Sequence, residues 1–428
     1  MTPEVKQRIE QIQQGIVPKG YKKTKSDIVP VDWKESSIGE YICEYTEKTT
    51  IPNQYPVLTS ARTGLMLQTD YYSNRQVTTE DNVGYNVLPY GYITFRSRSD
   101  DGRFRFNENR IIERGIISYF YPVFSFSEEV CHEYMLYLLN FSIYRRMYPY
   151  AEGTAQQVLS LKKLGQLKYS LPLVAEQKKI AETLSTQDKA IELQGRKIEE
   201  LKRFKKGCLE RMFPRKGQKV PEKRFPGFTD DWEQRKLGDI GKARSGVGFP
   251  DAEQGGVTGI PFFKVSDMNL DGNESEMTVA NNYVTAEQIA VHRWSPITEL
   301  PAIFFAKVGA AVMLNRKRLC RFPFLLDNNT MAYSLSSTKW DADFAKALFG
   351  TVDLTSLVQV GALPSYNAGD VESMEIYLPS LLEQEQIGVF FKQLDNLITL
   401  HQRKLEEMKN QKKALMQLLL TGIVRVRL

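Results

Sequence analysis

Cysteine and histidine are scarce in this sequence, and their placement argues against two common kinds of site. The 428 residues include four cysteines and three histidines, and no two cysteines form a Cys-x-x-Cys pair. Zinc sites need closely spaced ligands, and disulfide frameworks need several paired cysteines. We therefore expect neither a bound metal nor a fold held together by disulfides.

Motifs for enzymatic chemistry are also missing. No Pro-Pro dipeptide occurs, which removes the Asn/Asp-Pro-Pro-aromatic motif of amino-methyltransferases. Gly241 and Gly246 have the spacing of a phosphate-binding loop, but Val247 follows where that loop needs a lysine. The Glu-x-Lys pairs that begin at Glu200 and Glu407 lie in predicted helices and are explained by solvated helix charges. The sequence predicts no catalytic residues.

Long apolar runs are absent as well. No segment approaches the roughly 18 consecutive apolar residues that a membrane helix needs, and the first residues, MTPEVKQRIEQIQQG, are charged and polar. With 42% hydrophobic and 25% charged residues, the composition is that of a soluble globular protein long enough for two or three domains. We expect a cytoplasmic protein.

Positive charge is present but concentrated. The formal net charge is only +6, yet residues 196–224 carry twelve lysines and arginines against four glutamates. Such a run either forms a solvated helix face or contacts a polyanion, and the sequence leaves both readings open.

The most informative feature is a long internal repeat. The phrase LPLVAEQKKI (171–180) returns as LPSLLEQEQI (378–387), and the match continues at a constant shift without a gap. Apolar residues in each copy alternate at spacings of three and four, which is typical of a coiled-coil seam. Gln194 and His401 occupy equivalent polar positions in that seam. The two copies should therefore pair as long helices, through Ile180, Leu184, Ile191, Ile198 and Leu201 in the first and Ile387, Phe391, Leu394, Ile398, Leu405 and Met408 in the second.

A segment with its own unlike interior precedes each helix copy. Asp32-Trp33 and Asp231-Trp232 open these two segments at similar distances ahead of the repeat. Short apolar, aromatic-rich runs alternate there with Gly, Asn and Asp turns, which favours β-strands with a few helices, such as one near residues 128–144. The expected fold class is α+β, with two globular domains that are each followed by a long helix.

Basic residues in the two domains are candidates for contact with nucleic acid. In RSRSDDGRFRF (96–106), arginines alternate around an Asp-Asp-Gly turn, which would place them on one face of a hairpin, where guanidinium groups can bind guanine edges or phosphates. A solvated hairpin edge explains the same pattern. Basic residues also interrupt the apolar strands of the second domain, with the same two readings. The candidates are Arg96, Arg98, Arg103, Arg105, Lys264, Lys307, Arg316, Lys317 and Arg318.

Taken together, the two unlike domains and the repeated Leu-Pro-x-x-x-Glu-Gln helix resemble the specificity subunits of type I restriction-modification systems. The resemblance covers essentially the whole chain. Besides the repeated phrase, its most specific parts are KVPEKRFPGFTDDWEQRKLGDI (219–240) and ALMQLLLTGIVRV (414–426), which resemble the central junction and the C-terminal end of that family.

The resemblance implies two target recognition domains, each reading one half of a split DNA sequence, and an antiparallel coiled coil that spaces them and docks modification subunits. Gln156 and Gln157, in the loop GTAQQ ahead of the first helix, join the DNA-contact candidates; the equivalent loop GALPS has neither. The implied parts are an N-terminal helical segment (1–30), the first recognition domain (31–171), the central repeat helix and junction (172–220), the second recognition domain (221–378) and the C-terminal repeat helix (379–428).

Under this interpretation the chain binds double-stranded DNA, has no catalytic activity and holds no cofactor. S-adenosylmethionine-dependent methylation would lie on modification subunits, and ATP and magnesium on restriction subunits. Two alternatives stay open. A stand-alone DNA-binding regulator with two reader domains gives no reason for such long basic heptad helices, and a coiled-coil scaffold without a DNA role gives no reason for the arginine-rich segment.

Overall fold

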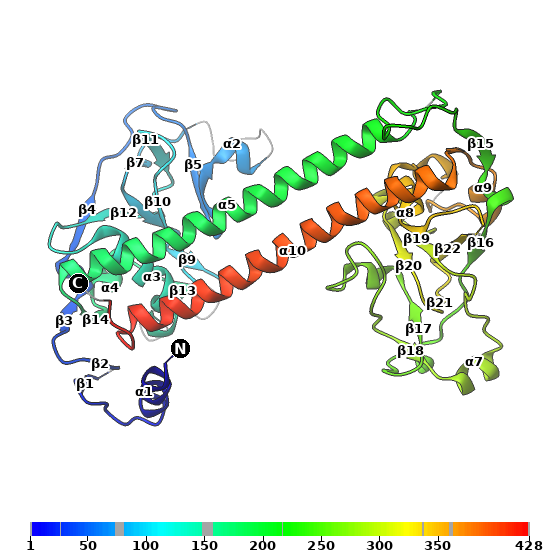
Figure 1. The fold of residues 1–428 in the computed structure, drawn as a ribbon. Helices are drawn as coiled ribbons and strands as arrows, with labels where there is room; N and C mark the ends of the chain where they lie inside the picture. Colours follow the sequence, from blue (N-terminus) through cyan, green and yellow to red (C-terminus); the bar gives the residue numbers. More distant parts are fainter. Residues whose placement is uncertain are drawn as a thin grey trace. The chain divides into compact units, whose positions relative to one another are not determined.

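The computed structural model describes residues 2–25, 27–72, 81–147, 157–215, 217–335, 338–358 and 363–426. The chain divides into two compact units, which we call unit 1 (residues 1–193 and 405–428) and unit 2 (residues 194–404). Two long helices, α5 (Val174–Met212) and α10 (Leu381–Leu420), each contribute one part to either unit (Figure 1). Each unit therefore consists of one globular domain with a segment of both helices.

Unit 1 is built from short strands around a four-stranded antiparallel sheet. The strand order in that sheet is β10 (Phe106–Glu108), β8 (Ile93–Phe95), β12 (Val123–Phe126), β4 (Ile42–Tyr45). Two-stranded pairs surround it: β1 (Tyr21–Lys23) with β2 (Ile28–Pro30), β3 (Lys34–Ser37) with β14 (Lys168–Leu171), β5 (Leu58–Ala61) with β6 (Gly64–Leu67), β7 (Asn86–Pro89) with β11 (Arg114–Ile117), and β9 (Arg98–Ser99) with β13 (Gln157–Val158).

The described α-helices of unit 1 are α1 (Pro3–Gln13), α2 (Gln68–Tyr71), α3 (His132–Met147) and α4 (Leu161–Gly165), besides the parts of α5 and α10. Of these, α3, α4, α5 and α10 contribute side chains to the core. Phe95, Phe106 and Phe124 from the sheet pack with Tyr134 of α3 in one buried cluster that also contains Ile180 of α5. The first turns of α5 are thus part of the domain core as well as of the helix pair. The helix predicted near residues 128–144 corresponds to α3.

Unit 2 has a different sheet arrangement. A four-stranded antiparallel sheet has the order β16 (Gly241–Ser245), β22 (Thr330–Leu335), β19 (Ala302–Ala306), β20 (Lys317–Cys320), and a three-stranded sheet has the order β18 (Tyr283–Val284), β17 (Ile260–Phe263), β21 (Leu325–Leu326). The remaining elements are the pair β15 (Glu233–Lys236) with β23 (Glu375–Leu378) and the helices α6 (Leu237–Ile240), α7 (Ala286–His292), α8 (Ala342–Thr351) and α9 (Ala368–Glu372). The interiors of the two domains are therefore unlike, as the sequence predicts.

The two units nevertheless share a framework at the base of the long helices. In unit 1, β3 follows the buried Trp33 and pairs with β14, whose last residue Leu171 opens the repeat. In unit 2, β15 follows the buried Trp232 and pairs in the same way with β23, which ends at Leu378. The two sequence motifs that recur, Asp-Trp and Leu-Pro, thus lie side by side in each unit.

The two long helices pack against each other in antiparallel orientation. In unit 1, the Gln187 side chain donates a hydrogen bond to the carbonyl oxygen of Met408, and Lys412 forms an ion pair with Asp188. In unit 2, Gln194 contacts His401 and Lys205 contacts Asp395, so residue numbers fall along α10 as they rise along α5. The antiparallel orientation implied by the family resemblance is therefore confirmed. All the seam positions named from the sequence are buried or half-buried.

The helix contacts of unit 2 repeat those of unit 1 at equivalent positions. Lys205 lies 2.5 Å from a carboxylate oxygen of Asp395, and Lys346 of α8 lies 2.9 Å from the other. Burial works against ionisation of Asp395, but the two lysines outweigh it and lower its pKa. The polar seam residues Gln194 and His401 contact each other, with 2.8 Å between Gln194 Nε2 and His401 Nδ1.

The mixture of helix and sheet confirms the predicted α+β class. Among the described residues, no helix combines the length and apolar character needed to cross a membrane.

Candidate nucleic-acid interface

The four arginines of residues 96–105 do not lie on one strand face, contrary to the prediction. β8 and β10 pair with Phe95 opposite Phe106, so the arginine-rich segment is the connection between these strands and not part of their ladder. Within it, Arg98 belongs to β9, which pairs with β13 instead. Alternation along a strand does not apply to a connection that leaves the sheet, and although all four arginines are exposed they lie in different surroundings.

Arg98 lies over one of two adjacent exposed aromatic rings. The turn between β11 and β12 presents Tyr119, 58% exposed, and Phe120, 39% exposed. Their ring centroids are 4.2 Å apart, and the Arg98 guanidinium carbon lies 4.4 Å from the centroid of Phe120. A guanidinium over an aromatic face is attracted to the negative face of the ring. Arg98, Phe120 and Tyr119 therefore form one contiguous group, in which the guanidinium lies over the Phe120 ring and the two rings are tilted by 44°.

Arg96 lies on the same side of the domain. The β8–β12 pairing, with Thr94 opposite Val123, brings it near Tyr121. The start of α2 lies next to β11, because the backbone N–H of Gln68 donates to the carbonyl oxygen of Val57, which forms a bridge with Ile116. Burial raises the pKa of Tyr121, Arg96 lowers it, and Tyr72 and Tyr71 raise it, as this placement leads one to expect. Tyr71 and Tyr72, at the end of α2, are 49% and 40% exposed. We call Tyr71, Tyr72, Tyr119 and Phe120 the aromatic tip.

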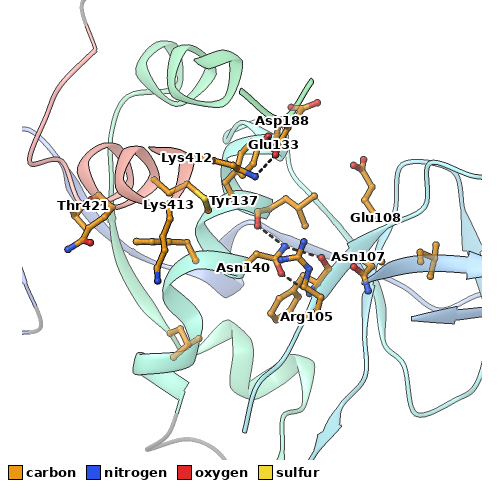
Figure 2. A pocket seen from close by; sticks show the side chains of 18 of the residues that line it. Arg105, Asn107, Glu108, Glu133, Tyr137, Asn140, Asp188, Lys412, Lys413 and Thr421 are labelled. Carbon is orange, nitrogen blue, oxygen red and sulfur yellow. Dashed lines mark hydrogen bonds and ion pairs between the residues drawn. The ribbon is translucent and has the colours of Figure 1, made fainter. Parts of the chain in front are cut away.

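Arg103 and Arg105 lie elsewhere. Arg103 is 3.9 Å from the carboxylate of Asp101, which also binds Arg62 at 2.7 Å. Arg105 lines a groove of about 1660 Å³ in unit 1, formed by β10, α3 and the last part of α10 (Figure 2). Figure 2 shows Lys413 on α10 at the same groove. Its other lining residues include Asn107, Glu108, Glu133, Tyr137, Asn140, Asp188, Lys409, Lys412 and Thr421.

Part of the charge around this groove is already paired. Lys412 is held by Asp188, and its ammonium nitrogen lies 5.4 Å from the ring centroid of Tyr137. Tyr137 in turn donates a hydrogen bond of 2.7 Å to Asp188. Arg105 and Lys413, like Lys25, have no ion-pair partner within the described ranges, so they remain available to an anionic ligand.

Two of the basic candidates of unit 2 serve the fold around β20. The Lys317 ammonium donates to the side-chain oxygen of Asn315 at 2.7 Å and to the carbonyl oxygen of Val352. Burial lowers the pKa of Lys317 to about 8. Arg318 donates from Nε to the carbonyl oxygen of Asn273 at 2.6 Å. Both side chains are used within the protein, which weakens their case as DNA contacts.

The other candidates of unit 2 are scattered. Lys264, between β17 and a 3-10 turn, donates to Gln254 at 3.0 Å. Arg316 donates to Asn269 at 2.7 Å, and Lys307 is half-buried after β19.

Of the two candidate glutamines in the loop before the first repeat helix, Gln156 lies outside the described residues. Gln157 opens β13, opposite Ser99, which places it beside the arginine-rich segment.

The glutamine of the repeated Leu-Pro-x-x-x-Glu-Gln motif performs the same task in both units. Gln177 donates to the carbonyl oxygen of Pro172 at 2.9 Å and accepts the backbone N–H of Cys131, just ahead of α3, at 2.8 Å. Its counterpart Gln384 donates to the carbonyl oxygen of Pro379 at 3.2 Å and accepts the backbone N–H of Asp341, just ahead of α8, at 3.1 Å. Both glutamines are buried, so each fixes the start of a domain helix to the start of a repeat helix.

The glutamate of the motif forms a buried ion pair in both units. Glu176, only 1% exposed, accepts two hydrogen bonds of 2.6 Å from Arg425, which also binds Asp32. Glu383, also 1% exposed, accepts hydrogen bonds of 2.8 and 2.6 Å from Arg224. In both pairs, hydrogen bonding to the buried glutamate raises the pKa of the arginine. We call each glutamate–arginine pair with its neighbouring glutamine a junction lock.

No group of three or more His, Cys, Asp or Glu residues in the described parts of the chain could hold a metal ion.

The aromatic tip is the feature that the sequence did not reveal. Residues 115–124, GIISYFYPVF, are one of the apolar, aromatic-rich runs that favour β-strand, whereas the structure places β11 and β12 on either side of an exposed turn within it. Ser118 and Pro122, which flank the three aromatic residues, are the local signal for that turn.

Comparison with known proteins gives a consistent result. The family model of the type I restriction modification DNA specificity domain matches residues 30–203 and 229–410. The MjaVIII type I restriction enzyme specificity subunit of Methanocaldococcus jannaschii is 26% identical over 301 residues, which are 64% of this chain and 66% of that protein, just under two thirds of its length.

Solved structures show the same fold over most of the chain. A chain from a structure of the type I R-M system covers 92% of this chain and 99% of its own length, with a TM-score of 0.57 at 14% identity. The type I restriction-modification S subunit from M. genitalium covers 94% of this chain and 99% of its own length, with a TM-score of 0.54 at 15% identity.

Proposed function

Since the chain belongs to the type I restriction modification DNA specificity family, with two copies of its domain, we propose that it is the DNA specificity subunit of a type I restriction-modification complex. Each globular domain reads one half of a split double-stranded DNA site, and α5 and α10 set the distance between the two readers. The chain has no catalytic activity of its own and selects the DNA sequence on which the enzyme complex acts.

The observation that carries this proposal is the contrast between the junctions and the domain interiors. Both units use the same strand pair, buried tryptophan and junction lock to join a domain to a repeat helix. The surfaces that the domains offer are unlike, because the aromatic tip and the large groove belong to unit 1. Two globular domains that are joined to the repeat helices in the same way, but that have different surfaces, suit a DNA target whose two halves have different sequences.

The proposed partners are modification subunits, which supply S-adenosylmethionine-dependent adenine methylation, and restriction subunits, which use ATP and magnesium. Leu193 on α5 and Leu400 on α10 occupy equivalent repeat positions, and each is 64% exposed. A single exposed leucine is common on protein surfaces, but exposure of the same repeat position on both helices suits a docking surface that the two helices share. We therefore place the attachment of modification subunits on the repeat helices.

The first test is to co-express the chain with a cognate modification subunit in a methylation-deficient host and map methylated adenines across the genome. The expected result is a split motif with a fixed gap that disappears when this chain is omitted. If the assembled complex is present and no motif appears, the proposal fails. Tight, sequence-specific binding by the isolated chain would instead favour a stand-alone regulator.

Exchange of one domain tests the division of labour. Replacing residues 31–171 with the corresponding segment of a relative should change one half of the motif and leave the other half and the gap intact. A change in both halves would contradict the assignment of one domain to each half-site.

A further inference from the structure

The aromatic tip of unit 1 is a surface built for stacking. Tyr119 and Phe120 come from one turn, and Tyr71 and Tyr72 come from the end of α2, yet all four are at least 39% exposed. Soluble proteins seldom leave several large rings together in solvent unless the patch binds something. Because the Arg98 guanidinium already lies over the Phe120 ring, and that ring is in contact with Tyr119, little conformational freedom is lost when another flat group binds there.

The charge beside the tip indicates what that group is. Arg96 and Arg98 are exposed, and neither has an ion-pair partner within the described residues. Of the two aspartates in the turn that follows Arg98, Asp101 is held by Arg62 at 2.7 Å. Uncompensated arginines beside exposed rings complement a nucleic acid, which offers flat bases and negative phosphates together.

From this geometry we propose that the aromatic tip inserts between stacked base pairs in the half-site read by the first domain, while Arg96 and Arg98 hold the neighbouring phosphates. The inference rests on the proposed DNA-reading function. Apolar and aromatic wedges unstack a base step, and the cost of unstacking depends on the sequence of that step. The first domain would therefore select a deformable step as well as base edges.

The second domain provides an internal control. Within the described part of residues 221–378, no Tyr, Phe or Trp is exposed to the extent of the rings of the tip. Its aromatic residues Phe249 and Phe262 are stacked 3.8 Å apart and packed against Trp294 instead. Distortion should therefore be confined to one half of the target.

The experiment uses the complex of this chain with its modification subunits and duplexes that carry 2-aminopurine at successive positions of either half-site, leaving out the methylated adenines. Unstacking raises the fluorescence of 2-aminopurine. We expect a rise at one step of the first half-site and none in the second. Tyr119→Ala with Phe120→Ala should abolish the rise in fluorescence. It should also weaken binding at least about 5-fold, since one base–aromatic stacking contact raises the affinity by at least about that factor.

Two further variants separate stacking from other effects. Tyr119→Leu with Phe120→Leu keeps apolar bulk but removes the rings, and it should also lose the signal. Tyr90→Ala is the matched control, because Tyr90 is 53% exposed but lies before β8, at the opposite end of that strand from Arg96. This control should bind and distort DNA like the unmodified chain.

The outcomes distinguish this inference from the function on which it rests. Specific binding without a fluorescence rise, or a rise that survives both double variants, overturns the wedge and leaves the specificity function intact. Failure of the unmodified complex to bind a specific site counts against the specificity function itself. If the double variants fold but no longer assemble with the modification subunits, the tip is a protein interface and the inference is wrong.

Discussion

Removal of Arg425 is the sharpest test of the junction lock. The side chain of Glu176 is 1% exposed, and its two oxygens both accept hydrogen bonds from Arg425. Arg425→Ala therefore leaves a buried carboxylate without its counter-ion. The same substitution also removes the pair with Asp32, which is 48% exposed.

The two losses differ greatly in size. Breaking a buried ion pair from one side costs about 3–5 kcal/mol, because the remaining charge stays buried without compensation. The exposed pair with Asp32 contributes at most about 1 kcal/mol. We therefore expect Arg425→Ala to lower the free energy of unfolding of unit 1 by about 3–5 kcal/mol. Adding Glu176→Gln removes the stranded charge, so the double variant should lose only about 1–3 kcal/mol, the cost of an imperfectly bonded buried amide.

Native-state hydrogen exchange measures this effect for each unit separately. Peptides from the start of α5 should lose protection in Arg425→Ala, while peptides from the start of α10, where Arg224 and Glu383 form the equivalent lock, should not change. Arg224→Ala is the matched variant and should show the reverse pattern. Full protection in Arg425→Ala, or a double variant less stable than the single one, would refute the view that the lock is a compensated buried charge.

Three further predictions concern pH, backbone space and DNA. The lowered pKa of Asp395 means that its contribution to the stability of unit 2 is present above pH 3.8 and lost as the pH falls through the folded pKa, so Asp395→Asn should flatten the acid side of the stability profile. Gly388→Ala should destabilise unit 2 despite the helix preference of alanine, because the added methyl group would lie 2.8 Å from the backbone nitrogen of Phe344, in the first turn of α8. Gly195→Ala adds a methyl group with nothing within 4 Å, so it should stabilise the protein by about 1 kcal/mol. Urea unfolding measures both effects. Arg105→Gln should reduce the slope of log affinity against log salt by about 1, as for one lost phosphate contact, and Lys317→Gln should leave that slope unchanged.

The scaffold could be predicted from the sequence because its signal is repeated and local. A heptad that occurs twice at a constant shift identifies both helices, and α5 and α10 begin within a few residues of the repeated Leu-Pro. The full role of the seam was less visible. Ile180 and Ile387 fit the heptad, yet they also belong to the cores of their domains, a contact that depends on strands distant in the sequence.

The recognition surfaces could not be predicted to the same degree, because they depend on how short strands connect. The alternation of Arg96 to Arg105 has the period of a strand, but β8 ends at Phe95 and the chain leaves the sheet. Likewise, Tyr119 and Phe120 have the composition of a core strand and lie in an exposed turn. Exposure is decided by tertiary contacts, which local pattern does not contain.

The junction lock also explains how two unlike domains can be joined to the repeat helices by the same contacts. Gln177 and Gln384 bind backbone N–H groups, and the residues that carry those groups, Cys131 and Asp341, have unrelated side chains. The lock thus requires a helix start at one place and sets no demand on the side chain there. Gln177→Ala should therefore destabilise unit 1 by about 1–3 kcal/mol by leaving a buried N–H without a partner. Cys131→Ala keeps the N–H and loses only a small buried side chain, so it should cost less; a larger loss in Cys131→Ala than in Gln177→Ala would show that the junction depends on the sequence of the domain it joins.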